Sequence, residues 1–523
     1  MGFLGRLAKP EKRPVREKIM RNVVFSGMRA LLVWPLPFLL IPYILKKVGS
    51  GGYGTWAVFL AIISLTSLAE MGLGGTLTKQ VAEYYARGDF GALSRLADTG
   101  LMLYALIALF AVVALNLGSS FLISRLLGSS AASVAELKVC WRYLCAMVAV
   151  NILTLPFYSI VTGLQRMDVS NILGYFNTVC AALLTVAFLS WGWALHGLLS
   201  ANVIAVSLTL ALHVWMLHKL LPDLRVNPLR FDLREAKHIL SFSVQLYLTQ
   251  IAVAIHTQVD KLYLALFVSV NAAGWYNIAG DAAWKVRTVP GLLLTPVMAA
   301  ASELDATGEQ QKVRELYYRS HKYLACFGVP LVLYVAVASR RLVALWVGPN
   351  LSMVAIPLAA LVLANFFNLT SGPGYLILMG QGILRPGVIS ALLGVVVNLT
   401  LSFLLTYLYG LTGAVIGTSA ALVVGTTYFL YLFHRLTKNP FSRLVREAYL
   451  KPVLSALVVL AIFFFVSPFN ELGWGGLVLQ GILFGTLYFY GLAVSRFFDQ
   501  FDLAKAESLV PIARIARRII RVA

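Results

Sequence analysis

Long apolar segments, separated by short polar ones, occupy almost the whole chain. Segments close to the ~20 residues that an α-helix needs to cross a bilayer recur along it. The pattern predicts an all-α polytopic membrane protein with about fourteen transmembrane helices, at 23–45, 54–75, 99–127, 136–160, 171–190, 196–218, 239–268, 274–300, 318–346, 353–380, 386–407, 412–435, 451–468 and 474–496.

Composition agrees with this prediction. Hydrophobic residues make up 59% of the 523 residues and charged residues only 12%, whereas soluble domains carry roughly 25% charged residues. The formal net charge of +21 could suggest a nucleic-acid partner, but the basic residues lie mainly between apolar segments rather than on one soluble face. We therefore expect no nucleic acid as a partner, and we interpret the positive charge as a topology signal.

Loops rich in lysine and arginine alternate along the chain with loops that contain few or none. The N-terminal tail 1–22, the linker 219–238 and the loop 436–450 are basic, whereas the connections 191–195, 269–273 and 408–411 hold no basic residue. Because cytoplasmic loops carry the excess of basic residues, both termini are predicted to be cytoplasmic. Fourteen spans agree with this, because an even number places both termini on the same side. We expect a multi-pass protein of a bacterial or archaeal cytoplasmic membrane.

The two halves of the chain resemble each other. The sequence from Leu155 matches the sequence from Gly372 at a nearly constant offset, which pairs Gly163 with Gly380, and the stretch that begins at Gly54 matches the stretch that begins at Gly274. Six spans separate the copies, so the repeat is parallel. We predict two six-helix lobes, at 23–218 and 239–435, and two extra helices at 451–496. A basic N-terminal tail (1–22), a linker (219–238), a loop (436–450) and a basic amphipathic C-terminal tail (497–523) complete the chain.

Several segments carry a family resemblance. The stretch GGYGTWAVFLAIISLTSLAEMGLGGTLTKQVAEYYARGD from Gly51, QVDKLYLALFVSVNAAGWYNIA from Gln258 and YGLTGAVIG from Tyr409 resemble the polysaccharide-biosynthesis flippases of the multidrug/oligosaccharidyl-lipid/polysaccharide exporter superfamily. The resemblance implies transport of a polyprenyl-pyrophosphate-linked oligosaccharide to the outer leaflet. It also implies membrane lipids and other polysaccharide-assembly proteins as partners, and we expect a monomer.

The eighth predicted span contains three charged residues. Asp281, Lys285 and Arg287 lie within GWYNIAGDAAWKVRTVP, and a basic side chain at the middle of a bilayer costs roughly 3 kcal/mol, so such residues normally face a cavity or a partner. Asp281 and Lys285 are four residues apart and can pair, whereas Arg287 lies about 200° around the helix from Lys285. We rank Arg287, on a face with Gly280, Trp284 and Gly291, ahead of Lys285 as the ligand of pyrophosphate, and the reverse assignment stays open.

Other polar residues within spans are candidate cavity residues. In the seventh span Gln245, Thr249, His256 and Asp260 fall within about 60° of one helix face, which predicts a stripe that faces either a cavity or another helix. Lys261 lies on another face, where it can pair elsewhere or reach the outer interface. Arg29, in the first span, can face the cavity or extend to the cytoplasmic interface.

Sequence patterns for catalysis are absent. The chain has no phosphate-binding Walker sequence and no HExxH motif, and its four cysteines lack metal-type spacing. We expect no catalytic residue, no metal and no cofactor, and we expect that the protein is not an enzyme. Two alternatives to a flippase stay open: a cation-coupled multidrug-type exporter, whose often cationic substrates a positive cavity would repel, and a membrane glycan polymerase or ligase.

Overall fold

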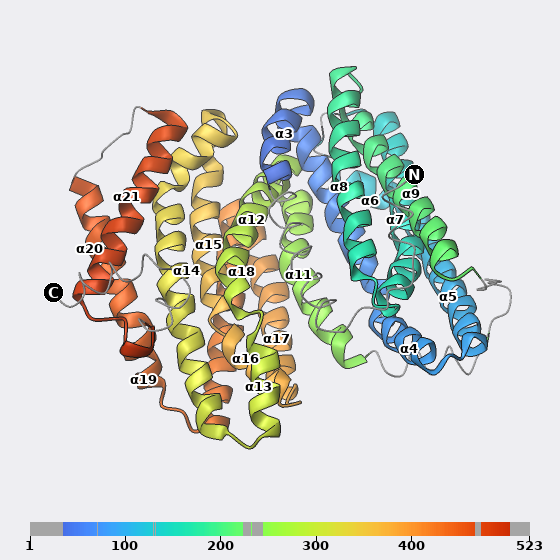
Figure 1. Ribbon diagram of the computed structural model, residues 1–523. Helices are drawn as coiled ribbons and strands as arrows, with labels where there is room; N and C mark the ends of the chain where they lie inside the picture. Colours follow the sequence, from blue (N-terminus) through green and yellow to red (C-terminus); the bar gives the residue numbers. More distant parts are fainter. Residues whose placement is uncertain are drawn as a thin grey trace. The chain divides into compact units, whose positions relative to one another are not determined.

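The structure is a computed structural model that describes residues 35–70, 72–128, 130, 132–222, 232, 244–465 and 472–502 (Figure 1). These residues form helices joined by short turns and contain no strand. The longer helices are α3 (Pro35–Thr66), α4 (Leu73–Arg87), α5 (Phe90–Leu117), α6 (Ser119–Leu126), α7 (Val134–Gly163), α8 (Met167–Ser190), α9 (Ala194–Leu220), α11 (Val244–Phe267), α12 (Val270–Gly291), α13 (Val297–Ala306), α14 (Gln310–Trp346), α15 (Ala355–Leu369), α16 (Gly372–Gly380), α17 (Arg385–Val397), α18 (Phe403–Thr437), α20 (Leu450–Phe465) and α21 (Gly473–Val494).

Nine helical segments of this described part are long and apolar enough to cross a membrane. Two of them change direction at a glycine with positive φ, Gly49 in α3 (φ 72°) and Gly410 in α18 (φ 59°), where glycine lacks the Cβ that disfavours this conformation. Both glycines fall between predicted spans. The helix α12 is not among the nine, because every 18-residue stretch of it contains three charged residues. The predicted total of fourteen spans stays a prediction.

The chain divides into two compact units, which are described separately. Unit 1 comprises residues 1–277 and 402–414, and unit 2 comprises residues 278–401 and 415–523. The division falls inside α12, whereas the predicted lobe boundary falls at 219–238. The helix α11 groups with unit 1 because it packs against α3. The lobes defined by the sequence repeat stay a prediction.

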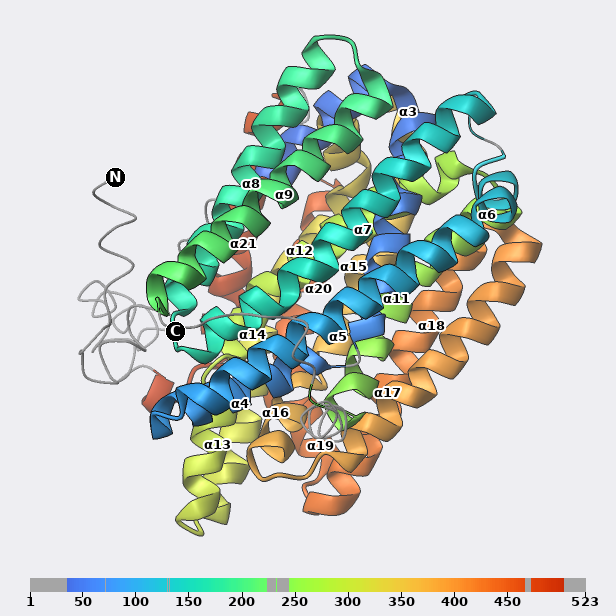
Figure 2. The same ribbon diagram turned by 90° about the vertical axis from the view of Figure 1, so that its right-hand side faces the viewer.

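In unit 1, the helices α5, α7, α8 and α9 run beside one another, and α4 lies across the end of α7 (Figures 1 and 2). Large apolar side chains fill the space between them. The buried ring of Trp141 packs edge to face on Phe59 of α3, with 6.1 Å between the ring centres. Its indole N–H donates a hydrogen bond to the carbonyl oxygen of Leu115 at 3.2 Å. This bond satisfies a polar group that would otherwise be costly to bury.

In unit 2, α14 packs against α15, α20 and α21. An ionic cluster ties α14 to the segment that follows α21: Arg319 lies 3.3 Å from a carboxylate oxygen of Asp499, and Lys322 pairs with both Asp499 and Asp502. The cluster attaches the C-terminal helix pair to the rest of the unit. The predicted amphipathic tail lies outside the described residues from 503 onward.

Close contacts at matched glycines agree with the repeat. In unit 1 a Cβ at Gly163 would lie 2.7 Å from the carbonyl oxygen of Thr78 in α4, and in unit 2 a Cβ at Gly380 would lie 2.7 Å from the carbonyl oxygen of Met298 in α13. The matched glycines therefore allow the same kind of close helix contact. Gly163 contacts α4, which follows the second predicted span, and Gly380 contacts α13, which follows the eighth.

The matched pair Gly54 and Gly274 shows a different relation, because these two residues contact each other within unit 1. A Cβ at Gly274 would lie 2.9 Å from the Cα of Gly54, and the nearby Asn277 donates a hydrogen bond to the hydroxyl oxygen of Tyr53 at 2.9 Å. The contact therefore joins α3 and α12 closely within unit 1.

Candidate functional site

The helix α12 carries the charged residues from which the candidate site is built. Its side chains at 280, 284, 287 and 291 recur at helical spacing, so they lie along one face. Two of these positions are glycines, and an added Cβ at Gly280 would meet nothing within 4 Å. The face therefore consists of two long side chains, Trp284 and Arg287, with open space beside them.

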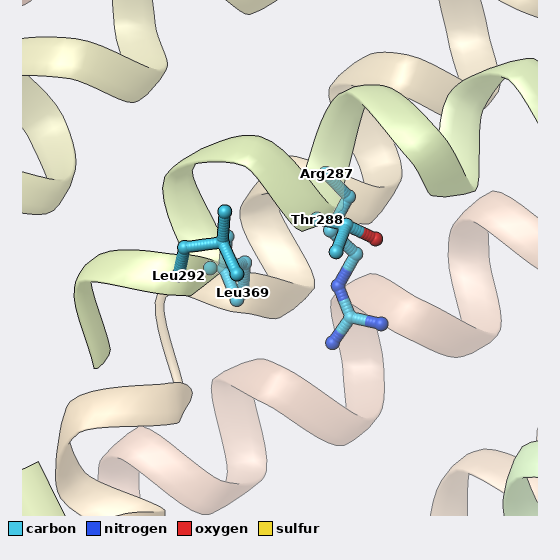
Figure 3. Close-up of a pocket in the computed structure, with 5 residues that line it drawn as sticks. Arg287, Thr288, Leu292 and Leu369 are labelled. Carbon is cyan, nitrogen blue, oxygen red and sulfur yellow. The ribbon is translucent and has the colours of Figure 1, made fainter. Parts of the chain in front are cut away.

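Arg287 reaches away from α12 toward other helices of unit 2 (Figure 3). One terminal guanidinium nitrogen donates to the amide oxygen of Asn368 in α15 at 3.0 Å, and the guanidinium carbon lies 4.6 Å from the ring centre of Trp284. The Nε atom is buried and has no hydrogen-bond partner among the described residues. Within that part of the chain no carboxylate pairs with Arg287.

An open cavity of about 230 Å³ adjoins this guanidinium and is lined by Arg287, Thr288, Gly291, Leu292 and Leu369. Figure 3 shows Leu292 and Leu369 together on one side, with Thr288 beside Arg287. A single water molecule needs only ~10–15 Å³ of such space, so the cavity has room for a ligand group. It offers one cation, one hydroxyl and otherwise apolar walls.

Lys285 has a different environment from Arg287. It interacts electrostatically with Asp281, one turn earlier on α12, and it is not among the residues that line the cavity. This arrangement favours the assignment of the two basic residues to different roles, with Lys285 beside a carboxylate and Arg287 beside the cavity.

The stripe on α11 belongs to unit 1. Asp260 is fully buried and accepts a hydrogen bond from the hydroxyl of Tyr276 in α12 at 2.9 Å, so this residue makes an interhelical contact. His256 has a buried Nδ1 with no partner in the described part of the chain. Lys261 is buried and donates to the side-chain oxygen of Gln258 at 3.0 Å, so it pairs on its own helix.

Some predicted candidates cannot be placed. Arg29 and the tail 1–22 lie outside the described residues, as do 223–231 and 233–243 of the predicted linker and of the start of the seventh span. The backbone of α11 includes Gln245 and Thr249, but their side chains also lie outside what the structure describes.

Asn368 and Thr426 were missed by the sequence reasoning. Asn368 accepts from Arg287, and its own amide donates to the hydroxyl of Thr426 in α18 at 3.0 Å. Asn368 of α15 thus holds the guanidinium directly, and Thr426 of α18 holds Asn368 in turn. An available signal was the position of Asn368 inside an apolar span, where a polar side chain needs a partner.

The chemistry that this arrangement supports is anion binding. The guanidinium of Arg287 is half-buried, and withdrawing a charge from water has a cost that one neutral amide and one aromatic face compensate only in part. The unused Nε and the adjoining cavity provide a donor and the space for an anionic group. Among the described residues no cluster of His, Cys, Asp and Glu has the arrangement of a metal site.

Comparisons with known proteins identify the family of the chain. The family model described as "Polysaccharide biosynthesis protein" matches residues 19–302. The chain is 16% identical over 423 residues to a "Putative O-antigen transporter" of Shigella flexneri, covering 80% of this chain and 98% of the relative. It is 20% identical over 466 residues to a "Probable low-salt glycan biosynthesis flippase Agl15" of Haloferax volcanii, covering 86% of each.

Solved structures show the same fold at low sequence identity. The structure titled "Lipid II flippase MurJ, inward closed conformation" matches with a TM-score of 0.71 at 16% identity, over 90% of this chain and 98% of that one. An inward-facing multidrug resistance MATE family transporter of the MOP superfamily matches with a TM-score of 0.58 at 16% identity, over 80% and 99%. These likenesses confirm the predicted all-α polytopic membrane fold. Because the family model covers more than half of its residues, the chain belongs to the polysaccharide biosynthesis protein family.

Proposed function

We propose that the protein is a flippase that moves a polyprenyl-pyrophosphate-linked oligosaccharide from the cytoplasmic to the outer leaflet by alternating access, for the assembly of a cell-surface polysaccharide. Family membership and the flippase and transporter names of the relatives support this. The protein acts in the cytoplasmic membrane, with both termini on the cytoplasmic side. It works as a monomer, carries out no chemical conversion, and receives its substrate from other polysaccharide-assembly proteins.

The observation that carries the proposal is the half-buried guanidinium of Arg287, which has a buried Nε donor without a partner, an adjoining cavity and no carboxylate partner among the described residues. A pyrophosphate supplies the missing negative charge, and the planar guanidinium fits two phosphate oxygens at once. A cationic drug would meet repulsion at the same position. The site therefore fits an anionic lipid headgroup best.

The role of Asn368 follows from the same geometry. It holds the guanidinium in one orientation through a neutral hydrogen bond, so it positions the charge without neutralising it. A carboxylate in its place would pair with the arginine and compete with the substrate. The neutral amide leaves the charge available for a phosphate.

The test is a reconstitution in liposomes that follows the exposure of a fluorescent polyprenyl-pyrophosphate-linked oligosaccharide to an external quencher. Wild-type protein is expected to expose the labelled sugar, and Arg287→Gln is expected to bind the lipid about 10- to 150-fold more weakly, because a hydrogen bond to a charged group contributes ~1.5–3 kcal/mol. Arg287→Lys keeps the charge but loses the planar fork, so we expect an intermediate value.

Arg340→Gln is the matched control, because Arg340 is an exposed arginine of α14 in the same unit. Transport by this variant is expected to equal that of wild type. The proposal fails if the purified protein never exposes the sugar, or if it joins or transfers the oligosaccharide instead. The role of Arg287 fails if Arg287→Gln transports and binds as wild type does.

A further inference from the structure

The face of α12 that carries Arg287 has a second feature that an anion site alone does not need. Trp284, one turn before Arg287, is 41% exposed and makes no ring contact with another aromatic side chain in the described part of the chain. The guanidinium of Arg287 lies over its ring at 4.6 Å from the ring centre. One face of the indole is therefore covered by a cation, and the ring is held in place beside the candidate phosphate site.

Open space lies on the same helix face as this indole, one turn earlier. Gly280 lies one turn before Trp284, and an added Cβ at Gly280 would meet nothing within 4 Å. The indole N–H has no hydrogen-bond partner among the described residues. The structure thus presents a flat apolar surface, a free donor and unfilled space along a single stretch of helix.

These features fit a pyranose ring. Sugars place several C–H groups on one face of the ring, which pack on a flat aromatic surface, while their hydroxyl groups at the edge accept hydrogen bonds from a donor such as an indole N–H. In a lipid-linked oligosaccharide a single oxygen joins the first sugar to the pyrophosphate. A phosphate bound at Arg287 therefore brings the first sugar next to Trp284.

We propose that Trp284 binds the first sugar of the lipid-linked oligosaccharide by stacking, in the space that Gly280 leaves open, while Arg287 binds the adjoining pyrophosphate. This inference rests on the proposed function and adds a contact to the same site. Arg287 recognises the charge that every polyprenyl pyrophosphate carries, and Trp284 distinguishes a lipid that bears a sugar from one that does not.

The experiment compares two probes, undecaprenyl pyrophosphate and its N-acetylglucosamine conjugate, bound to the full chain in nanodiscs and titrated by native mass spectrometry. Trp284→Leu is expected to weaken binding of the conjugate about tenfold, the size of one aromatic stacking contact, and to leave binding of the sugar-free lipid within about twofold. Trp284→Phe keeps a smaller aromatic face and is expected to retain part of the preference. Arg287→Gln is expected to weaken both probes equally.

A second variant tests the space rather than the ring. Gly280→Leu fills the open position beside Trp284 and is expected to weaken binding of the conjugate alone. Gly485→Leu is its matched control, because Gly485 is a helical glycine of α21 that also has nothing within 4 Å of an added Cβ. The control variant is expected to bind both probes as wild type does.

Two results would overturn the inference: equal binding of both probes by Trp284→Leu and wild type, or an equal loss of both probes in Trp284→Leu. The first result would show that Trp284 contacts membrane lipid rather than sugar, and the second would show a structural role. Failure of the proposed function gives a different result, since wild type would then bind the conjugate without exposing it to the external quencher in liposomes.

Discussion

The crossing of α3 and α12 at Gly54 and Gly274 gives a prediction whose size follows from the structure. Gly54→Ala would place a Cβ 1.9 Å from the carbonyl oxygen and 2.5 Å from the carbonyl carbon of Val270. Ordinary van der Waals contact of such atoms begins near 3.4 Å. The Cβ would therefore lie about 1.5 Å too close to the carbonyl oxygen, and the two helices must move apart by more than 1 Å to accept it. Neither contact atom belongs to a side chain that could rotate away.

Overpacking of this kind costs typically ~1–3 kcal/mol. At roughly 1.6 °C per kcal/mol for a unit of this size, we expect the unfolding midpoint of Gly54→Ala to fall by about 2–5 °C. The assay is thermal unfolding of the purified protein in detergent, followed by tryptophan fluorescence at a fixed scan rate. In transport assays the same variant is expected to be slower, because α3 and α12 can no longer meet closely.

Gly75→Ala is the control, because Gly75 is a helical residue of α4 in the same unit and an added Cβ there meets nothing within 4 Å. Alanine favours a helix over glycine by up to about 1 kcal/mol, so this variant is expected to be as stable as wild type or slightly more stable. If Gly54→Ala unfolds at the same temperature as Gly75→Ala, the close crossing of these helices is refuted.

Three further predictions concern single interactions. Asn368→Ala removes the hydrogen bond that orients the guanidinium of Arg287. At ~1 kcal/mol per hydrogen bond, this variant is expected to bind undecaprenyl pyrophosphate about fivefold more weakly, with an unfolding midpoint close to that of wild type. An unchanged affinity would contradict the role of Asn368. Tyr276→Phe removes a donor to the buried carboxylate of Asp260 and is expected to cost ~1–3 kcal/mol, seen as a lower midpoint in the thermal assay. Burial alone would raise the pKa of Asp499, but a backbone N–H and two neighbouring cations outweigh it and lower the pKa. A lowered pKa stabilises the folded state above the ordinary pKa of aspartate, and this stabilisation is lost as the pH falls through the folded-state pKa. Between pH 5 and 3 the free energy of unfolding of wild type should therefore fall further than that of Asp499→Asn, by at most the ~1 kcal/mol of an exposed ion pair. An equal fall in both proteins would refute this role.

The helices could be predicted from the sequence because membrane spans depend on a strong local signal. The glycines at 49 and 410 fall in the predicted gaps between spans, since a chain that turns needs backbone conformations that favour glycine. The repeat was visible for the same reason: glycines at Gly163 and Gly380 permit equivalent close contacts, so both halves keep them at a similar offset. The grouping of α11 with α3 was not predictable, because packing between distant segments leaves no periodic pattern in either of them.

The candidate site could be predicted only in part. Helical geometry separated Arg287 from Lys285, since the angle between two positions on one helix follows from their spacing. The partners of Arg287 come from α15 and α18, which are distant in the sequence, so Asn368 and Thr426 could not be assigned to it. The carboxylate of Asp260 illustrates the same limit, because the sequence could not decide between a cavity and a helix partner such as Tyr276.

The central claim is that the guanidinium of Arg287 binds the pyrophosphate of the lipid-linked substrate. The most direct measurement is a cryo-electron microscopy structure of the full chain in nanodiscs, saturated with a polyprenyl-pyrophosphate-linked oligosaccharide. The account predicts a phosphate oxygen about 2.7–2.9 Å from a guanidinium nitrogen of Arg287, the distance of a charge-assisted hydrogen bond. Pyrophosphate bound elsewhere, with Arg287 still bonded to Asn368 and no phosphate in contact with it, would contradict the account.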